Sequence, residues 1–119
     1  MSGAFTFVDE LRPAGDEPIR VLARVQVAAT ADGGRSGPFT GKFRPNHNFG
    51  GAENRNFFIG QLEVPEGEWV YPGETRELTI TFMNVVGLRE QLTPGRRWRL
   101  QEGWRLIATA ELLLLLPMS

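Results

Sequence analysis

The chain is organised around two stretches, GGRSGPFTGKFRP at residues 33–45 and FFIGQLEVPEG at residues 57–67. In the first stretch, glycines and prolines separate short apolar pieces, a pattern typical of turns between short strands. Pro45 cannot donate to a strand ladder, so we expect residues 39–45 to be an edge strand or a strand that leaves its sheet. In the second stretch, residues 57–64 predict a strand, which the Pro-Glu-Gly turn at residues 65–67 ends.

The same short-strand pattern continues on both sides of this centre. Residues 19–27 alternate between apolar side chains on one face and mostly polar ones on the other, as a half-buried strand does. Residues 76–83 alternate in the same way. Residues 96–110 predict a hairpin that turns at Glu102-Gly103, and the polar residues 46–56 predict a loop.

Length and composition bound the architecture. The chain has 119 residues and is 41% hydrophobic, which suits one domain with a single core. Its 14 glycines and 8 prolines are spread along the chain, and no segment has a convincing helical period. Six or seven short strands without a helix predict an antiparallel closed barrel or a sandwich.

The two central stretches and the final hairpin resemble the C-terminal β-barrel domain, the third domain, of the elongation factor Tu family. That family has GGR followed by Pro-Phe, an aromatic-Arg-Pro triplet and a Pro-Glu-Gly turn. Its closing hairpin aligns without a gap with residues 95–110, and the resemblance covers about residues 19–116. It implies an all-β fold, an antiparallel closed β-barrel of six to seven strands at residues 18–119, after an N-terminal extension at residues 1–17.

In the family this domain contacts aminoacyl-tRNA, and the matching positions can be compared one by one. The resemblance places Arg35, Glu102 and Gly103 at family contact positions and keeps their residue types. Four other contact positions carry different residues here, namely Ser36, Asn46, Ile59 and, approximately, Asn84. The family's GTPase domain has no counterpart in this chain. We therefore expect tRNA binding to be weak or absent.

Several site classes are excluded by residue content. Without cysteine the chain has no disulfide, thiolate metal site or Cys nucleophile. His47, its one histidine, has no second histidine to share a metal, and we expect it to be a solvent-facing loop residue. No serine has triad spacing, and the glycines form neither a P-loop nor a dinucleotide fingerprint. We expect no enzyme, no cofactor and no metal.

Arginine and tryptophan alternate at the final hairpin, RRWR at residues 96–99 and WR at residues 104–105. This mixture can grip phosphates and stack bases. Alternatively, Trp98 and Leu100 fill the core while Arg97 and Arg99 coat the surface and pair with Glu77 or Glu111. The net charge of −1 favours the second interpretation. The candidate contacts to RNA or to a protein partner are Arg35, Arg44, Arg97, Arg99, Glu102, Gly103 and Trp104.

The run Leu112–Leu116 is apolar on both faces, so one face must meet something other than water. We expect a cover from Phe5, Phe7 and Val8 or from Leu113 and Leu115 of a second copy, which would make a homodimer. The run is far shorter than the ~20 residues that cross a membrane. The chain is expected to be a cytoplasmic, non-enzymatic module that binds a protein partner, possibly in translation. The alternative is an accessory protein that binds RNA or tRNA.

Overall fold

The computed structural model describes residues 6–7, 14–15 and 17–117. Within them lie eight strands and two three-residue 3-10 helices, η2 at Thr30–Asp32 and η3 at Arg89–Gln91. The strands are β1 Thr6–Phe7, β2 Ile19–Val27, β3 Lys42–Phe43, β4 Asn46–Asn48, β5 Asn56–Glu63, β6 Thr75–Phe82, β7 Arg97–Glu102 and β8 Arg105–Leu115.

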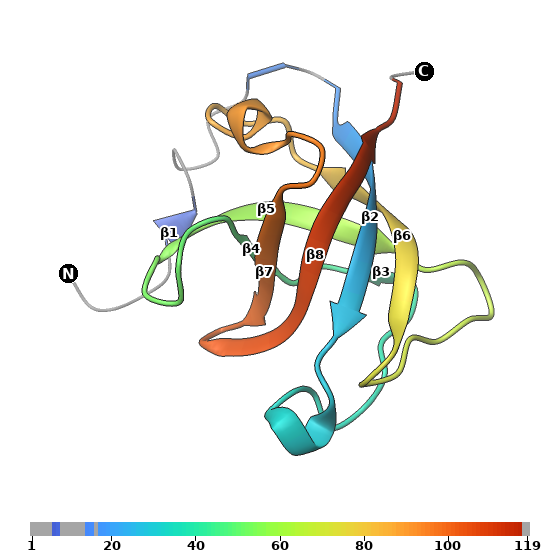
Figure 1. The fold of residues 1–119 in the computed structure, drawn as a ribbon. Helices are drawn as coiled ribbons and strands as arrows, with labels where there is room; N and C mark the ends of the chain where they lie inside the picture. The colour runs from blue at the N-terminus through green and yellow to red at the C-terminus, as the bar shows by residue number, and fades with distance from the viewer. Residues whose placement is uncertain (1–5, 8–13, 16, 118–119) are drawn as a thin grey trace.

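Six of these strands close a barrel, as expected from the sequence. Its order is β5-β4-β7-β8-β2-β6, and a further pairing between β5 and β6 completes the ring (Figure 1). Every neighbouring pair in the ring is antiparallel. The chain is therefore all-β, and closure gives each ring strand a neighbour on both sides.

One segment differs from the expectation. Residues 46–48 form β4 instead of part of a loop, and β4 lies between β5 and β7. Before Pro45, residues 42–43 form β3, whose one partner among the described strands is β5, as expected for an edge strand. Pro45 falls in the gap between β3 and β4, where a missing N–H interrupts the ladder only briefly. The Asn-His-Asn sequence is typical of a turn because its side chains are polar, but the side chains of His47 and Asn48 are buried and hydrogen-bonded inside the fold.

The inner faces of the strands build one core. On β2 the odd-numbered residues from Ile19 to Val27 are buried, and Leu78, Ile80 and Phe82 of β6 face them. Trp98 and Leu100 of β7 are also buried, so the hairpin arginines on either side point outward. Of the two interpretations of the hairpin, this is the one in which Trp98 fills the core and is not exposed for stacking on bases.

His47 is fully buried, which corrects the prediction of a solvent-facing histidine. Its Nε2 lies 2.9 Å from the carbonyl oxygen of Gly60, and its Nδ1 lies 3.1 Å from Nε1 of Trp98. The indole N–H can only donate, so Nδ1 accepts and Nε2 carries the proton. Both ring nitrogens are satisfied, which allows a histidine inside an apolar core.

The turns of the barrel gather at its two ends. Helix η2, the β7–β8 turn and the approach to β6 lie toward the lower end in Figure 1, while η3 and the end of β8 lie toward the upper end. The strand β1 pairs in parallel with β5, on the opposite side of the ring from β8.

Candidate functional site

The β7–β8 hairpin tip collects most of the predicted contact residues. Gly103 turns the hairpin with a φ of 59°, a conformation that favours glycine. Arg35, from the loop before β3, donates through Nη1 to the carboxylate of Glu102. It also donates to the carbonyl oxygens of Gly37 and Pro38, at 3.2 and 3.4 Å. Arg35 thus ties its own loop to the hairpin, with one hydrogen bond from each of its three guanidinium nitrogens.

Trp104 stands beside this ion pair with 51% of its surface exposed. The guanidinium of Arg55, from the β4–β5 loop, lies 4.0 Å from the centre of its ring. Such a contact holds an aromatic face and a cation together at the surface. The polar β4–β5 loop therefore packs back against the hairpin.

Hydrogen bonds between side-chain amides link the same loop to strands β4 and β7. Asn48 donates to Gln101 at 2.8 Å, and both side chains are buried although they belong to the outer face of the barrel. Asn54 in the loop donates to Asn48 at 2.7 Å, and Arg99 donates to Gln101 at 2.9 Å. Arg99 is consequently engaged in a neutral polar network and is only partly exposed.

Arg97 belongs to a row of alternating charges that crosses four strands. It pairs in register with Glu111 on β8, which pairs with Arg24 on β2, which pairs with Glu77 on β6. Arg24 lies 3.4 Å from Glu111 and 3.7 Å from Glu77. Glu77 and Glu111 do pair with a surface arginine, but it is Arg24. Of the two arginines predicted to pair with them, Arg97 has Glu111 as its cross-strand neighbour, and Arg99 donates to Gln101 instead.

Arg44 lies apart from the other predicted contact residues. Its Nε donates to Gln61 on β5 at 2.9 Å. It borders a shallow hollow that Ile59 and Met83 also line. The structure thus brings together Arg35, Glu102, Gly103, Trp104 and Arg99, and leaves Arg97 and Arg44 outside that group.

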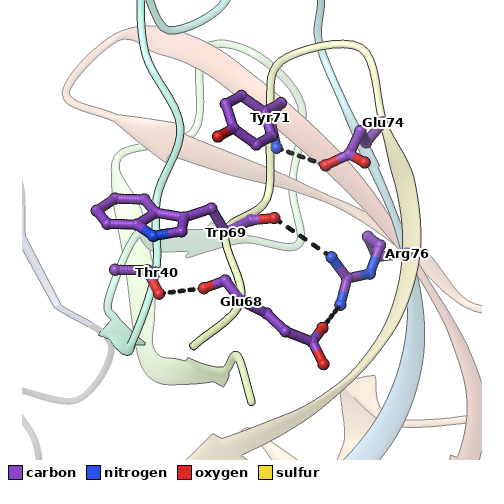
Figure 2. Close-up of polar contacts among 6 residues, drawn as sticks. All are labelled: Thr40, Glu68, Trp69, Tyr71, Glu74 and Arg76. Atoms are coloured by element: carbon purple, nitrogen blue, oxygen red, sulfur yellow. Dashed lines mark hydrogen bonds and ion pairs between the residues drawn. The ribbon is translucent and has the colours of Figure 1, made fainter. Parts of the chain in front are cut away.

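A second surface was not among the predicted contacts. In the β5–β6 connection, Trp69 and Tyr71 are 50% and 53% exposed, while Val70 between them is fully buried. Figure 2 shows both rings on one side of the segment, with the side chains of Glu68, Glu74 and Arg76 on the other side. We call Trp69 and Tyr71 the aromatic ridge. The signal in the sequence was the alternation Trp-Val-Tyr between the Pro-Glu-Gly turn at residues 65–67 and the Pro-Gly turn at residues 72–73.

Hydrogen bonds hold the backbone of the segment that carries the ridge (Figure 2). Val70 and Phe39 exchange two backbone hydrogen bonds of 2.9 Å, and Thr40 donates to the carbonyl oxygen of Glu68. Arg76 donates to the carbonyl oxygen of Trp69 at 3.4 Å and to the carboxylate of Glu68. The N–H of Tyr71 donates to Glu74 at 2.6 Å. Two large aromatic rings are therefore presented to solvent from a fixed backbone.

The leucine run at the end of β8 is partly exposed. Leu112 is buried, whereas Leu114 and Leu115 are 52% and 38% exposed, after a bulge opposite Leu22 and Ala23 of β2. The bulge reverses which leucines face outward. Phe7 belongs to β1, whose neighbour is β5 and not β8, while Phe5 and Val8 lie outside the described residues. A second copy as the cover stays a prediction.

Three further observations concern the described part of the chain. It holds no cluster of three or more His, Cys, Asp or Glu side chains placed to bind a metal ion. None of its helices is long and apolar enough to cross a membrane. No known protein family has a model that matches the chain.

Proposed function

We propose that the chain is a non-enzymatic binding module that engages a protein partner through the aromatic ridge. The observation that supports this proposal most directly is the exposure of Trp69 and Tyr71 on a hydrogen-bonded frame. Tryptophan and tyrosine are the residues that most often dominate protein interfaces. A ring that is already held in place loses little conformational entropy when a partner covers it.

The hydrogen bonds of this segment exclude one mode of binding, the addition of a partner strand. Both main-chain groups of Val70 are used by Phe39, and the carbonyl oxygens of Glu68 and Trp69 also have donors. A partner strand would need free N–H and C=O groups on this segment to extend a sheet. The ridge therefore binds through its side chains.

RNA binding is the second candidate function, and the Arg55–Trp104 stack is the observation that favours it. A cation on an indole beside Arg99 is the kind of surface on which bases stack. The charges around it weigh against RNA, because Glu102 neutralises Arg35 and the charge row alternates in sign. We place protein binding first for this reason.

The resemblance to the elongation factor Tu C-terminal barrel suggests which partners to examine. In that family the barrel packs against the other domains, and we propose that the corresponding surfaces of this chain engage proteins of the translation apparatus. This part of the proposal rests on the sequence motifs around Gly33–Pro45 and the final hairpin.

Affinity capture tests the proposal with two matched variants. Immobilised wild-type protein, Trp69→Ala/Tyr71→Ala and Trp104→Ala are each incubated with cytosol, and bound proteins are identified by mass spectrometry. We expect a partner that binds the wild type and Trp104→Ala but not the double variant. A partner that binds all three equally contradicts the ridge as its site. Recovery of no translation protein contradicts the translation-related version alone.

A further inference from the structure

The acidic residues around the aromatic ridge indicate what kind of partner it takes. Residues 63–77 contain five glutamates against one arginine, Arg76. Arg76 is paired with Glu68, Arg24 is paired with Glu77, and Lys42 stands opposite Glu63 in the β3–β5 ladder. Two carboxylates, Glu66 and Glu74, then have no cationic partner among the residues that the structure describes.

In the sequence these two glutamates lie on either side of the ridge. Glu66 precedes Trp69 by three residues, and Glu74 follows Tyr71 by three. The turns that bracket the segment hold its backbone, since Glu68 N–H donates to the carbonyl oxygen of Pro65 at 3.0 Å and Glu74 N–H donates to that of Tyr71 at 3.1 Å. The Glu74 carboxylate accepts the N–H of Tyr71 on the side of the segment away from the rings. The segment that carries the aromatic pair thus also carries two negative charges without a cationic partner among the described residues.

Aromatic faces attract cations, and tryptophan does so most strongly. Side chains two residues apart in an extended segment leave their Cα atoms separated by roughly 7 Å, which leaves room for one planar guanidinium between two rings. The net negative charge that Glu66 and Glu74 give to the segment adds a longer-range attraction that favours a cation over a neutral group.

We infer that the aromatic ridge binds an arginine or lysine side chain from an extended segment of the partner. The inference rests on the proposed protein-binding function and specifies its ligand. An acidic or purely apolar segment would leave Glu66 and Glu74 facing a like charge or no charge at all, at a cost in affinity. A basic segment suits both the exposed rings and the net negative charge of the segment that carries them.

The three tryptophans make a direct test possible. Each gives its own indole N–H signal in NMR, and they differ in environment, with Trp69 on the ridge, Trp98 buried and Trp104 at the hairpin tip. Full-length protein is titrated with the capped pentapeptide Gly-Arg-Gly-Arg-Gly. We expect a saturable shift of the Trp69 signal only. A shift of the Trp104 signal without that of Trp69 overturns the inference, and so does no shift up to 10 millimolar peptide.

Two further peptides and two protein variants separate the effect of charge on binding from the effect of side-chain shape. Replacing both arginines of the peptide by glutamine should weaken binding roughly tenfold, the scale of one desolvated cation–π contact. The variant Glu66→Gln keeps the shape of the ridge and should weaken the arginine peptide several-fold, while Glu53→Gln, on the β4–β5 loop, should leave it unchanged. A second peptide, in which glutamate replaces both arginines, should not bind.

The possible failures are distinguishable. Equal binding of the glutamine peptide at Trp69 overturns the requirement for a cation but leaves protein binding at the ridge intact. Loss of the proposed function would show instead as a captured partner that ignores Trp69→Ala/Tyr71→Ala. A Trp69 signal that moves with protein concentration alone would identify a second copy as the occupant and overturn the inference of a basic partner segment.

Discussion

His47 sits where three strands of the barrel meet and touches two of the largest core residues. Its ring lies edge-on to Phe82, with centroids 4.8 Å apart, and accepts the indole N–H of Trp98. Burial lowers the pKa of His47 from 6.5 to about 4, and the hydrogen bond with Gly60 opposes the shift. The neutral ring is therefore part of the folded state.

This buried ring predicts an acid-dependent loss of stability. In the unfolded chain His47 takes up a proton below about pH 6.5, whereas in the folded chain it does so only near pH 4. The unfolded state therefore binds more protons in this window, and the free energy of unfolding falls as the pH decreases from 6.5 to 4. The difference between the two pKa values corresponds to about 3 kcal/mol of stability.

Urea denaturation at pH 7.0, 6.0 and 5.0 measures this effect above the range in which most carboxylates titrate. The variant His47→Gln removes the titrating group and should have a flatter pH dependence over the same interval, even if its stability at pH 7.0 is lower. Parallel slopes for the two proteins would contradict the assignment of the effect to His47.

Gly60 predicts a steric effect at the same place. A Cβ on this residue would lie 2.7 Å from Nε2 of His47 and 2.8 Å from Cδ1 of Phe82, both on rings packed in the core. Gly60→Ala should therefore destabilise the protein by ~1–3 kcal/mol through overpacking. The matched control is Gly51→Ala, since a Cβ there meets nothing within 4 Å. Thermal unfolding of both variants checks this, and equal melting temperatures would contradict it.

Among the elements, strands β7, β8, β2 and β6 share the charge row formed by Arg97, Glu111, Arg24 and Glu77. Opposite charges face each other at every step, which is favourable between neighbouring strands. Each pair is exposed, so each contributes at most about 1 kcal/mol. The row neutralises the arginine surface that would otherwise attract phosphate.

Reversing the charge at Glu111, in the middle of this row, should show how much the row contributes to stability. Glu111→Lys would put three positive charges side by side on β7, β8 and β2, and should lower the free energy of unfolding by ~1 kcal/mol at low salt. Because exposed charges are screened, most of the loss should disappear at 0.5 M NaCl. The control is Glu77→Gln at the end of the row, with a smaller effect. A loss that does not change with salt would contradict the electrostatic explanation.

For the whole molecule, the charge distribution predicts poor tRNA binding. The net charge is −1, and Arg35 and Arg24 are paired with carboxylates, so few counterions are released when the surface meets a phosphate backbone. We expect a Kd of roughly 10⁻⁴ M or weaker at physiological salt. Titration of labelled aminoacyl-tRNA measures it.

Arg35→Ala serves as the test of specificity in that titration. Its guanidinium is engaged by Glu102 and two carbonyl oxygens, so the substitution should change stability more than affinity for RNA. Sub-micromolar binding that is lost in Arg35→Ala would instead put RNA binding ahead of protein binding.

The sequence by itself determined the barrel strands with strong alternation. The period-two pattern of residues 19–27 and 76–83 and the glycine turn of the final hairpin were read correctly because one face of each strand is buried and the other is wet. Such patterns are local, and a local pattern can be read without knowing the neighbours.

Only the tertiary structure decided the residues whose environment comes from distant parts of the chain. Asn46–Asn48 became a central strand because β5 and β7 supply partners on both sides, and His47 became a core residue because Gly60 and Trp98 satisfy its nitrogens. Trp69 became an exposed ring because Val70 pairs with Phe39, thirty-one residues earlier. Polar side chains can be buried and aromatic ones exposed when long-range hydrogen bonds fix them, and a single sequence does not contain those distances.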